Sequence, residues 1–150
     1  MEERFKTFTV LISTINRNIK RIKSEEMDEF NLKSPHVSCL YYLYTSDSLS
    51  AKELCDICGE DKASISRSLE FLENNGYLVC DTTQKKRYRS QLMLTEKGQA
   101  IAKLISDKID RILEFASDGL SNEKRKSMYE GLTLISNNLE NLCKNYKEIK

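Results

Sequence analysis

The sequence lacks the features of a secreted or membrane-spanning protein. No stretch approaches the roughly 18 consecutive apolar residues of a transmembrane helix, and Met1–Arg4 leads into an amphipathic segment without the apolar core of a signal peptide. The cysteines number five, an odd count that argues against a disulfide framework. We therefore expect a soluble, cytoplasmic protein with reduced thiols and no membrane partner.

Few residues indicate catalysis. The single histidine, His36, has no identifiable triad partner, and the sequence contains neither a glycine-rich phosphate loop nor a nucleophile elbow. We expect no enzyme activity and no cofactor. The formal net charge is only +1, so no overall field attracts the protein to DNA or to an anionic membrane, and a DNA-binding surface must come from local clusters of cations.

Both ends of the chain carry apolar residues at alternating spacings of three and four. This pattern is typical of a narrow apolar seam on a helix that packs against a partner helix. Each run is too short for an isolated coiled coil of about three to four heptads. We predict that residues 1–30 and 118–150 form a dimerisation lobe, with packing inside one chain as the alternative. The predicted interface residues are Phe5, Phe8, Ile12, Ile15, Met128, Leu132, Ile135, Leu139 and Leu142.

The middle of the chain begins with two helix-start signals. Ser34 followed by Pro35 predicts a helix with Ser34 as N-cap and the proline at the first helical position. Ser50 and Glu53 have the spacing of a capping box, in which each side chain accepts a hydrogen bond from the other residue's main-chain amide. A short helix should follow Ser50 and end near Gly59.

A second helix and a hairpin follow this short helix. Residues 62–75 have helical periodicity, and Gly76 is placed to stop that helix. Residues 77–80 and 91–94 are short and apolar and flank a polar, basic segment, which predicts a β-hairpin with a long tip. Thr95 is a suitable cap for a long helix that reaches about residue 116, and a serine at position 121 suits the next one.

The helix predicted at 62–75 opens with the side chains that a DNA major groove requires. Short hydroxyls can bond base edges or phosphates, and a long cation can contact a guanine or a phosphate. The preceding short helix supplies a hydroxyl and a cation for backbone phosphates, and the cationic hairpin tip suits the minor groove. The candidate DNA-binding residues are Ser50, Lys52, Lys62, Ser64, Ser66, Arg67, Lys85, Lys86, Arg87 and Arg89.

The segment Asp61–Leu78, followed by the basic hairpin and by Leu94–Gly98, resembles the MarR family of bacterial transcription regulators. The resemblance covers nearly the whole chain. It implies a mainly α fold with a small β-hairpin wing (α+β): a winged helix-turn-helix lobe at 34–95, a connecting helix at 96–117, and terminal dimerisation helices. It also implies a homodimer that binds double-stranded DNA at a near-palindromic operator, most simply as a repressor.

The wing departs from the family pattern. The family usually carries an Asp-x-Arg pair that braces the hairpin, whereas this chain has Lys86, Arg87 and Tyr88 at the aligned place. The extra cation should strengthen phosphate attraction and steepen the salt dependence of DNA binding.

Sensor sites are the least defined part of the sequence. Cys55 and Cys58 form a C-x-x-C motif, but they share a face with an inward leucine and are interpreted as small hydrophobic residues. A metal site would need further ligands, and we predict none. Cys39 and Cys143 are candidates for a redox-active thiol, so a thiol-based redox-sensing regulator remains an alternative.

Aromatic residues surround the helix that begins near residue 34. The resemblance implies that small aromatic effectors bind between the dimerisation and DNA-binding lobes, which makes Phe30, His36 and Tyr41 candidate pocket residues. Aromatic residues at helical spacing are also typical of an ordinary core. A winged-helix dimer that binds other proteins is a second alternative, because the fold does not determine the function.

Overall fold

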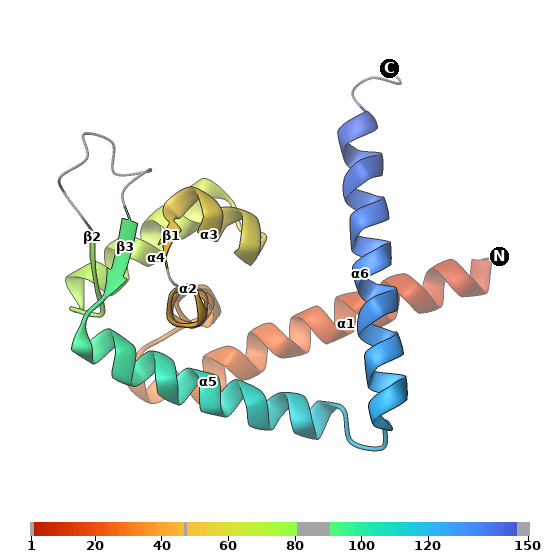
Figure 1. The fold of residues 1–150 in the computed structure, drawn as a ribbon, viewed down its shortest axis with the longest axis horizontal. Helices are drawn as coiled ribbons and strands as arrows, with labels where there is room; N and C mark the ends of the chain where they lie inside the picture. Colours follow the sequence, from red (N-terminus) through yellow and green to blue (C-terminus); the bar gives the residue numbers. More distant parts are fainter. Residues whose placement is uncertain (1, 47, 81–90, 147–150) are drawn as a thin grey trace. The chain divides into compact units, whose positions relative to one another are not determined.

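A computed structural model describes residues 2–46, 48–80 and 91–146 of the chain. Within these ranges the protein is mainly helical with a small antiparallel sheet, which confirms the predicted fold class (Figure 1). The helices are α1 Glu2–Glu26, α2 Ser34–Thr45, α3 Ala51–Cys58, α4 Lys62–Asn74, α5 Glu96–Ala116 and α6 Asn122–Asn145, with a 3-10 turn, η1, at Asp28–Phe30. The strands are β1 Leu49–Ser50, β2 Leu78–Cys80 and β3 Gln91–Leu94.

The chain divides into two compact units. The first spans Met1–Ile109 and the second spans Asp110–Lys150. The first unit therefore contains α1 to α4, the sheet and most of α5, whereas the second contains the end of α5 and all of α6. No helix among the described residues is both long enough and apolar enough to cross a membrane.

Helix α2 forms the centre of the first unit. It lies between the α3–α4 pair and the two long helices α1 and α5 (Figure 1). Its buried residues are Val37, Cys39, Leu40 and Leu43. The fully buried side chains of the core come from α3, α4, β2, α5 and the segment between α1 and α2, and include Met27, Leu32, Leu54, Ile65, Leu72, Leu78 and Ile105. This shared core makes the helix-turn-helix and the base of the wing one packed body.

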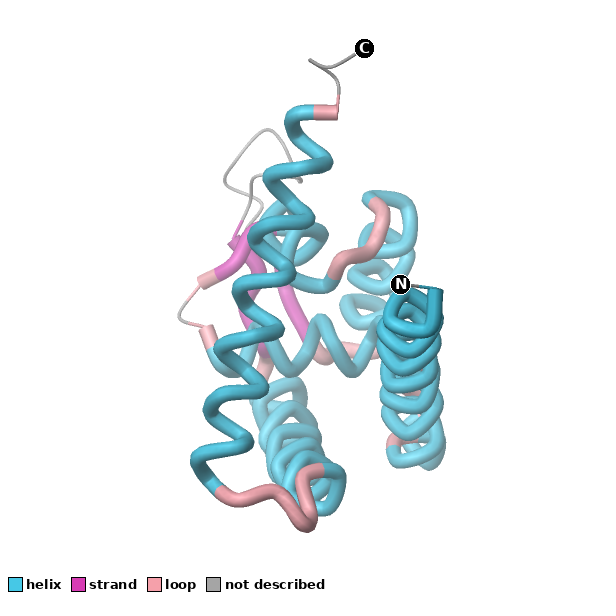
Figure 2. The backbone as a smooth tube through the Cα atoms, turned by 90° about the vertical axis from the view of Figure 1, so that its right-hand side faces the viewer, coloured by secondary structure: helices cyan, strands magenta, loops and turns pink. Residues whose placement is uncertain are grey.

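The sheet has three strands in the order β1-β3-β2, and both pairings are antiparallel. Figure 2 draws these strands in magenta. Val79 pairs with Met93 in the predicted hairpin, so the structure confirms that β2 and β3 flank the wing. The sequence did not predict β1. In this strand Leu49 pairs with Leu92 just before α3 begins, and the pairing attaches the start of α3 to the wing.

Local capping patterns located most of the helix ends correctly. The Ser50–Glu53 capping box opens α3, and Ser121 Oγ accepts the Lys124 N–H at 3.3 Å to open α6. Thr95 Oγ1 accepts the Gly98 N–H at 3.0 Å at the start of α5. Helix α5 ends at Ala116, as predicted.

The prediction for the start of α2 was wrong by one residue. Ser34 is already helical and Lys33 occupies the N-cap position, so Pro35 is the second helical residue. The physical reason is that the main-chain amides of Ser34 and Lys33 donate hydrogen bonds to other side chains. The Ser34 N–H donates to Ser24 Oγ at 3.0 Å, and His36 Nδ1 accepts the Lys33 N–H at 3.1 Å.

Candidate nucleic-acid interface

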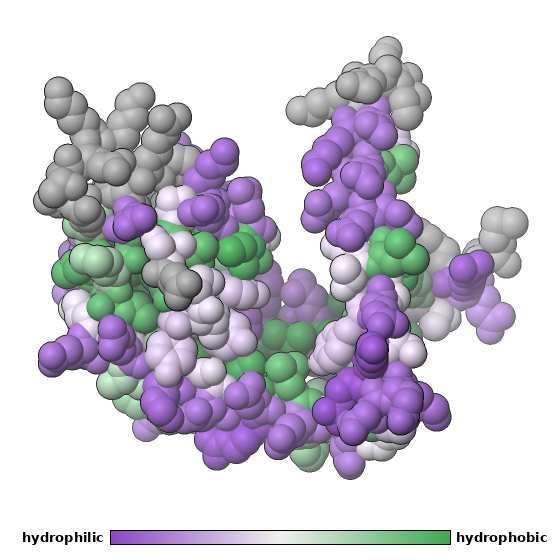
Figure 3. All heavy atoms as spheres, in the orientation of Figure 1, coloured by the Kyte–Doolittle hydropathy of each residue, from purple (hydrophilic) through white to green (hydrophobic). Residues whose placement is uncertain are grey.

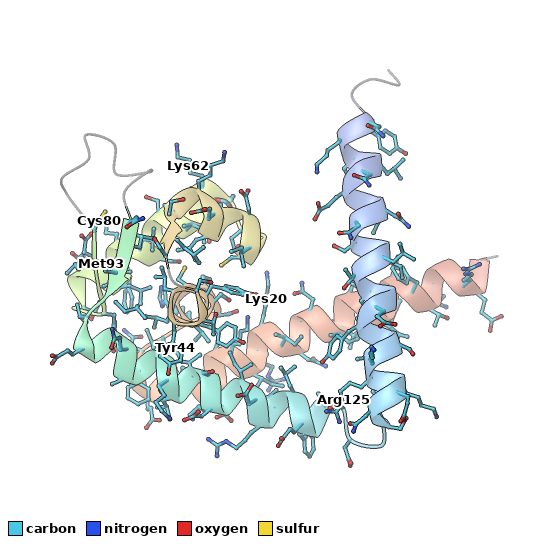
Figure 4. All side chains as sticks on the ribbon, in the orientation of Figure 1. Lys20, Tyr44, Lys62, Cys80, Met93 and Arg125 are labelled. Atoms are coloured by element: carbon cyan, nitrogen blue, oxygen red, sulfur yellow. The ribbon has the colours of Figure 1, made fainter. Side chains whose placement is uncertain are left out.

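The N-terminus of α4 presents the predicted recognition residues to solvent. Lys62, Ser66 and Arg67 are exposed and Ser64 is partly buried. Figure 4 shows the Lys62 side chain projecting outward from α4. Asp61 is the N-cap, and its Oδ1 accepts the Ser64 N–H at 2.8 Å. This role was not predicted from the sequence, although an Asp directly before a helical segment is a recognisable cap signal.

The opposite face of α4 fixes the direction in which these residues point. Ile65, Leu69 and Leu72 are buried in the core. Ser68 is only 4% exposed, and its hydroxyl donates to the Ser64 carbonyl oxygen at 2.9 Å. Because these inward residues are buried in the core, the exposed hydroxyl and cations of the first turns are held on a packed helix.

The start of α3 holds the two predicted phosphate-contacting residues in different environments. Lys52 is exposed. The Ser50 hydroxyl instead donates to Glu53 Oε2 at 2.7 Å and accepts the Glu53 N–H at 3.3 Å. The pKa of the Glu53 carboxyl is lowered, first by the hydrogen bond from the Ser50 main-chain amide and then by the one from its hydroxyl. Ser50 thus serves the helix start, and its contact with a phosphate stays a prediction.

The four cations predicted at the wing tip, Lys85, Lys86, Arg87 and Arg89, lie outside the described residues. The base of the wing is described, and Figure 4 labels Cys80 and Met93 on its two strands. A cavity of about 170 Å³ lies between this base and α4. Its lining includes Lys62 and Ser66 together with strand residues such as Leu78 and Leu92, so recognition helix and wing base form one surface.

The wing base is attached to the end of α4 by the first turn of α5. Thr95 Oγ1 donates to the Gly76 carbonyl oxygen at 2.6 Å, and the Thr95 N–H donates to the Tyr77 carbonyl oxygen at 3.1 Å. Lys97 Nζ donates to the Asn75 carbonyl oxygen at 2.8 Å and lies 4.4 Å from the centre of the Tyr77 ring. These contacts fix where the wing leaves the body of the domain.

The predicted effector residues contact different partners in the structure. The His36 ring stacks on Phe71, with centroids 4.2 Å apart and planes 1° from parallel. Tyr41 contacts the edge of Tyr42 at a centroid distance of 5.4 Å, and Phe30 packs against the core. An effector site stays a prediction. Among the residues that the structure describes, no group of three or more His, Cys, Asp or Glu could hold a metal ion.

The predicted dimerisation residues are exposed in each unit taken by itself. In α1 the exposed fractions are 38% for Phe8, 41% for Ile12 and 53% for Ile15, while the Phe5 side chain lies outside the described part. No described residue of α6 is buried, and Figure 3 shows hydrophobic side chains among hydrophilic ones along this helix. The exposed seam residues of α6 are Met128, Leu132, Ile135, Leu139 and Leu142.

Comparison with known proteins agrees with this geometry. Residues 36–113 match the family model described as a winged helix DNA-binding domain. The HTH-type transcriptional regulator YfiV of Bacillus subtilis is 24% identical over 119 residues, covering 79% of this chain and 74% of that protein.

Two solved structures extend the similarity to the fold. A putative MarR family regulator from Listeria monocytogenes, crystallised with a 26mer DNA, has a TM-score of 0.81 at 23% identity and covers 91% of both chains. The MepR–DNA complex of S. aureus has a TM-score of 0.77 at 19% identity, covering 88% of this chain and 97% of that one. The chain belongs to the winged helix DNA-binding domain family, and its fold is similar to that of MarR family regulators.

Proposed function

We propose that the protein is a cytoplasmic, sequence-specific repressor that binds a near-palindromic operator in double-stranded DNA as a homodimer. The observation that carries this proposal is the first part of α4, where Lys62, Ser66 and Arg67 are exposed on a helix whose other face is packed. A helix N-terminus also favours a phosphate through its free amides and dipole. The Listeria and S. aureus proteins crystallised with DNA support the same use of this fold.

The homodimer is supported by the exposed seams of α1 and α6. Two long helices with apolar residues at helical spacing would leave a large apolar surface in water, and such surfaces mark interaction sites. A two-fold dimer places two copies of α4 on the same duplex. The half-sites should then be one helical turn apart, about 34 Å between centres.

The proposal is tested by fluorescence anisotropy with the DNA that flanks the gene for this protein. We expect tight binding that resists nonspecific competitor and weakens steeply with salt. Arg67→Ala should weaken operator binding by roughly 1–3 kcal/mol because a base or phosphate contact is lost. Lys52→Ala should mainly reduce the salt slope by about one unit, because one phosphate contact is removed.

The matched control is Arg17→Ala, which removes an exposed arginine from α1, outside the helix-turn-helix. It should leave the affinity and the salt slope close to those of the unmodified protein. Equal affinity for the Arg67→Ala and Arg17→Ala proteins would contradict docking through α4. Weak binding that competitor abolishes would instead favour the alternative of a winged-helix dimer that binds proteins.

A further inference from the structure

The outward face of α4 carries a carboxylate in line with the side chains predicted to contact DNA. Ala63, Arg67 and Glu70 are all exposed. They are four and three residues apart, so in a helix they lie in one row along the same side. The residues on the opposite side of α4 are buried in the core. This outer row therefore faces away from the protein body, on the side that meets DNA in the proposed function.

Glu70 and Arg67 are not bonded to each other. Their spacing of three residues would allow an ion pair. Among the residues that the structure describes, however, neither side chain has a hydrogen bond or an ion pair. The other carboxylate of α4, on Glu73, is partly buried and lines the cavity beside the wing base. Glu70 is therefore the carboxylate of α4 that is available to an incoming duplex.

A carboxylate in this place opposes general attraction to DNA. Helix α4 contains the cations Lys62 and Arg67 and the carboxylates Glu70 and Glu73, so it has no net charge. Binding that ignores the base sequence depends on cations that neutralise phosphates, and Glu70 works against it. A carboxylate that is partly desolvated between two phosphate strands also needs a hydrogen-bond donor, because an unpaired charge is costly there. Glu70 can therefore favour binding only where a base edge supplies that donor.

The major groove offers two such donors, the N4 amino group of cytosine and the N6 amino group of adenine. Adenine presents its N7 acceptor beside the amino group, and the lone pair of N7 repels a carboxylate oxygen. The groove edge of cytosine has no acceptor, so a carboxylate is best matched to cytosine. The guanidinium of Arg67 is matched to guanine, whose O6 and N7 both accept hydrogen bonds.

The spacing of the two side chains fits neighbouring base pairs. An α-helix rises about 1.5 Å per residue, which places Arg67 and Glu70 about 4.5 Å apart along the helix axis. Successive base pairs of a duplex are about 3.4 Å apart. A recognition helix that lies in the major groove can thus direct these two side chains to adjacent base pairs.

We propose that Glu70 determines part of the operator specificity by accepting a hydrogen bond from the N4 amino group of a cytosine. This cytosine lies in the base pair next to a guanine that Arg67 contacts. Where the cytosine is replaced, the Glu70 carboxylate has no donor and still repels the phosphates, so other sequences bind more weakly. This inference rests on the proposed function. It assigns Glu70 two effects that a merely structural residue would not have: a preference for one base, and weaker binding to nonspecific DNA.

The first test selects bound duplexes from a library with a random central segment and sequences them, for the full-length wild type, Glu70→Gln and Arg67→Ala. Glutamine has a helix propensity similar to that of glutamate, but its amide both donates and accepts and is matched to adenine. We expect the wild type to prefer cytosine at one position of each half-site by at least about fivefold. Glu70→Gln should lose this preference in favour of adenine, and Arg67→Ala should lose the preference for the neighbouring guanine.

The second test measures fluorescence anisotropy with a duplex that lacks the selected sequence. Glu70→Gln should bind this nonspecific duplex about twofold more tightly than the wild type, because a charge that repels phosphates is removed. The matched control is Glu29→Gln, which removes the same charge from an exposed residue of η1, outside the helix-turn-helix. It should leave the base preferences and the nonspecific affinity unchanged. A substitution that only disturbed the fold would weaken binding to both kinds of duplex.

The outcomes separate this inference from the proposed function. A wild type that selects a common sequence, together with a Glu70→Gln protein that selects the same one, would overturn the role of Glu70 in reading a base. Unchanged nonspecific affinity in Glu70→Gln would overturn the repulsion. A wild type that selects no common sequence would contradict the proposed function, and the role of Glu70 with it.

Discussion

At the scale of a single residue, His36 connects the start of α2 with the recognition helix α4. Its Nδ1 accepts the Lys33 N–H at 3.1 Å, and its ring stacks on Phe71 of α4. A second proton on the imidazole would remove this acceptor and place a cation next to Lys33. Burial, and secondly the Lys33 charge, lower the pKa of His36 below its ordinary value.

This lowered pKa predicts a stability that depends on pH. An unfolded chain has a His36 pKa of about 6.5, so between this value and the lower folded value the unfolded state binds more protons. The free energy of unfolding should therefore be highest above about pH 6.5 and should decrease as the pH falls through the folded pKa. Urea unfolding at several pH values measures this decrease.

The control for His36 is His36→Gln, because a glutamine at this position can accept the same amide hydrogen bond without titrating. The difference in unfolding free energy between the two proteins should change with pH only in the acidic range. An identical pH profile for the two proteins would show that His36 does not carry the effect.

At the scale of an element, α5 is positioned by the absence of a side chain at Gly98. A Cβ built on this glycine would overlap the carbonyl oxygen of Tyr77, the atom that accepts the Thr95 N–H. The first turn of α5 can therefore pack directly on the main chain at the start of the wing. This close approach explains a glycine inside a helix, where it is otherwise unfavourable compared with alanine.

Gly98→Ala should consequently decrease the free energy of unfolding by about 1–3 kcal/mol, the usual cost of inserting a methyl group into a packed region. The contact is with main chain, so relief requires a shift of α5 or of the wing. The adjacent Gln99 is exposed, and Gln99→Ala is the matched control with an expected change near zero. Denaturant unfolding of both proteins provides the comparison, and equal stabilities would contradict the packing argument.

Element ends were predictable from the sequence where their causes are local. The Ser50–Glu53 box and the caps at Thr95 and Ser121 each involve residues three apart, so their patterns can be recognised without tertiary structure. The start of α2 was misplaced because Ser34 bonds Ser24, a residue ten positions away.

Contacts between distant segments could not be predicted in this way. Strand β1 exists because Leu49 pairs with Leu92, and two residues are too few for a periodic pattern. The exposed face of α4, in contrast, followed from helical periodicity. The hydrogen bond from the Ser50 hydroxyl to Glu53 competes with the phosphate contact predicted for Ser50.

At the scale of the whole molecule, the exposed apolar seams of α1 and α6 form the proposed dimer interface. Leu132, Ile135 and Leu139 are 40%, 38% and 50% exposed in the second unit, and Ile12 and Ile15 are similarly exposed in the first. Burial of one leucine contributes about 1.5–3 kcal/mol relative to leaving it in water. In a two-fold dimer each seam residue occurs twice at the interface, so a single substitution changes the interface at two places.

Leu139→Glu should therefore convert the dimer to monomer, because it places a carboxylate in each half of the proposed apolar interface. The control Asn138→Glu adds the same charge at a neighbouring exposed position outside the seam and should remain dimeric. Sedimentation velocity measures the mass of both proteins.

The two recognition helices of a dimer act with a high effective concentration on one operator, so the monomer should lose at least tenfold in affinity for the full operator. On DNA with one half-site it should bind as the wild type does. A Leu139→Glu protein that remains dimeric would exclude this part of α6 from the interface.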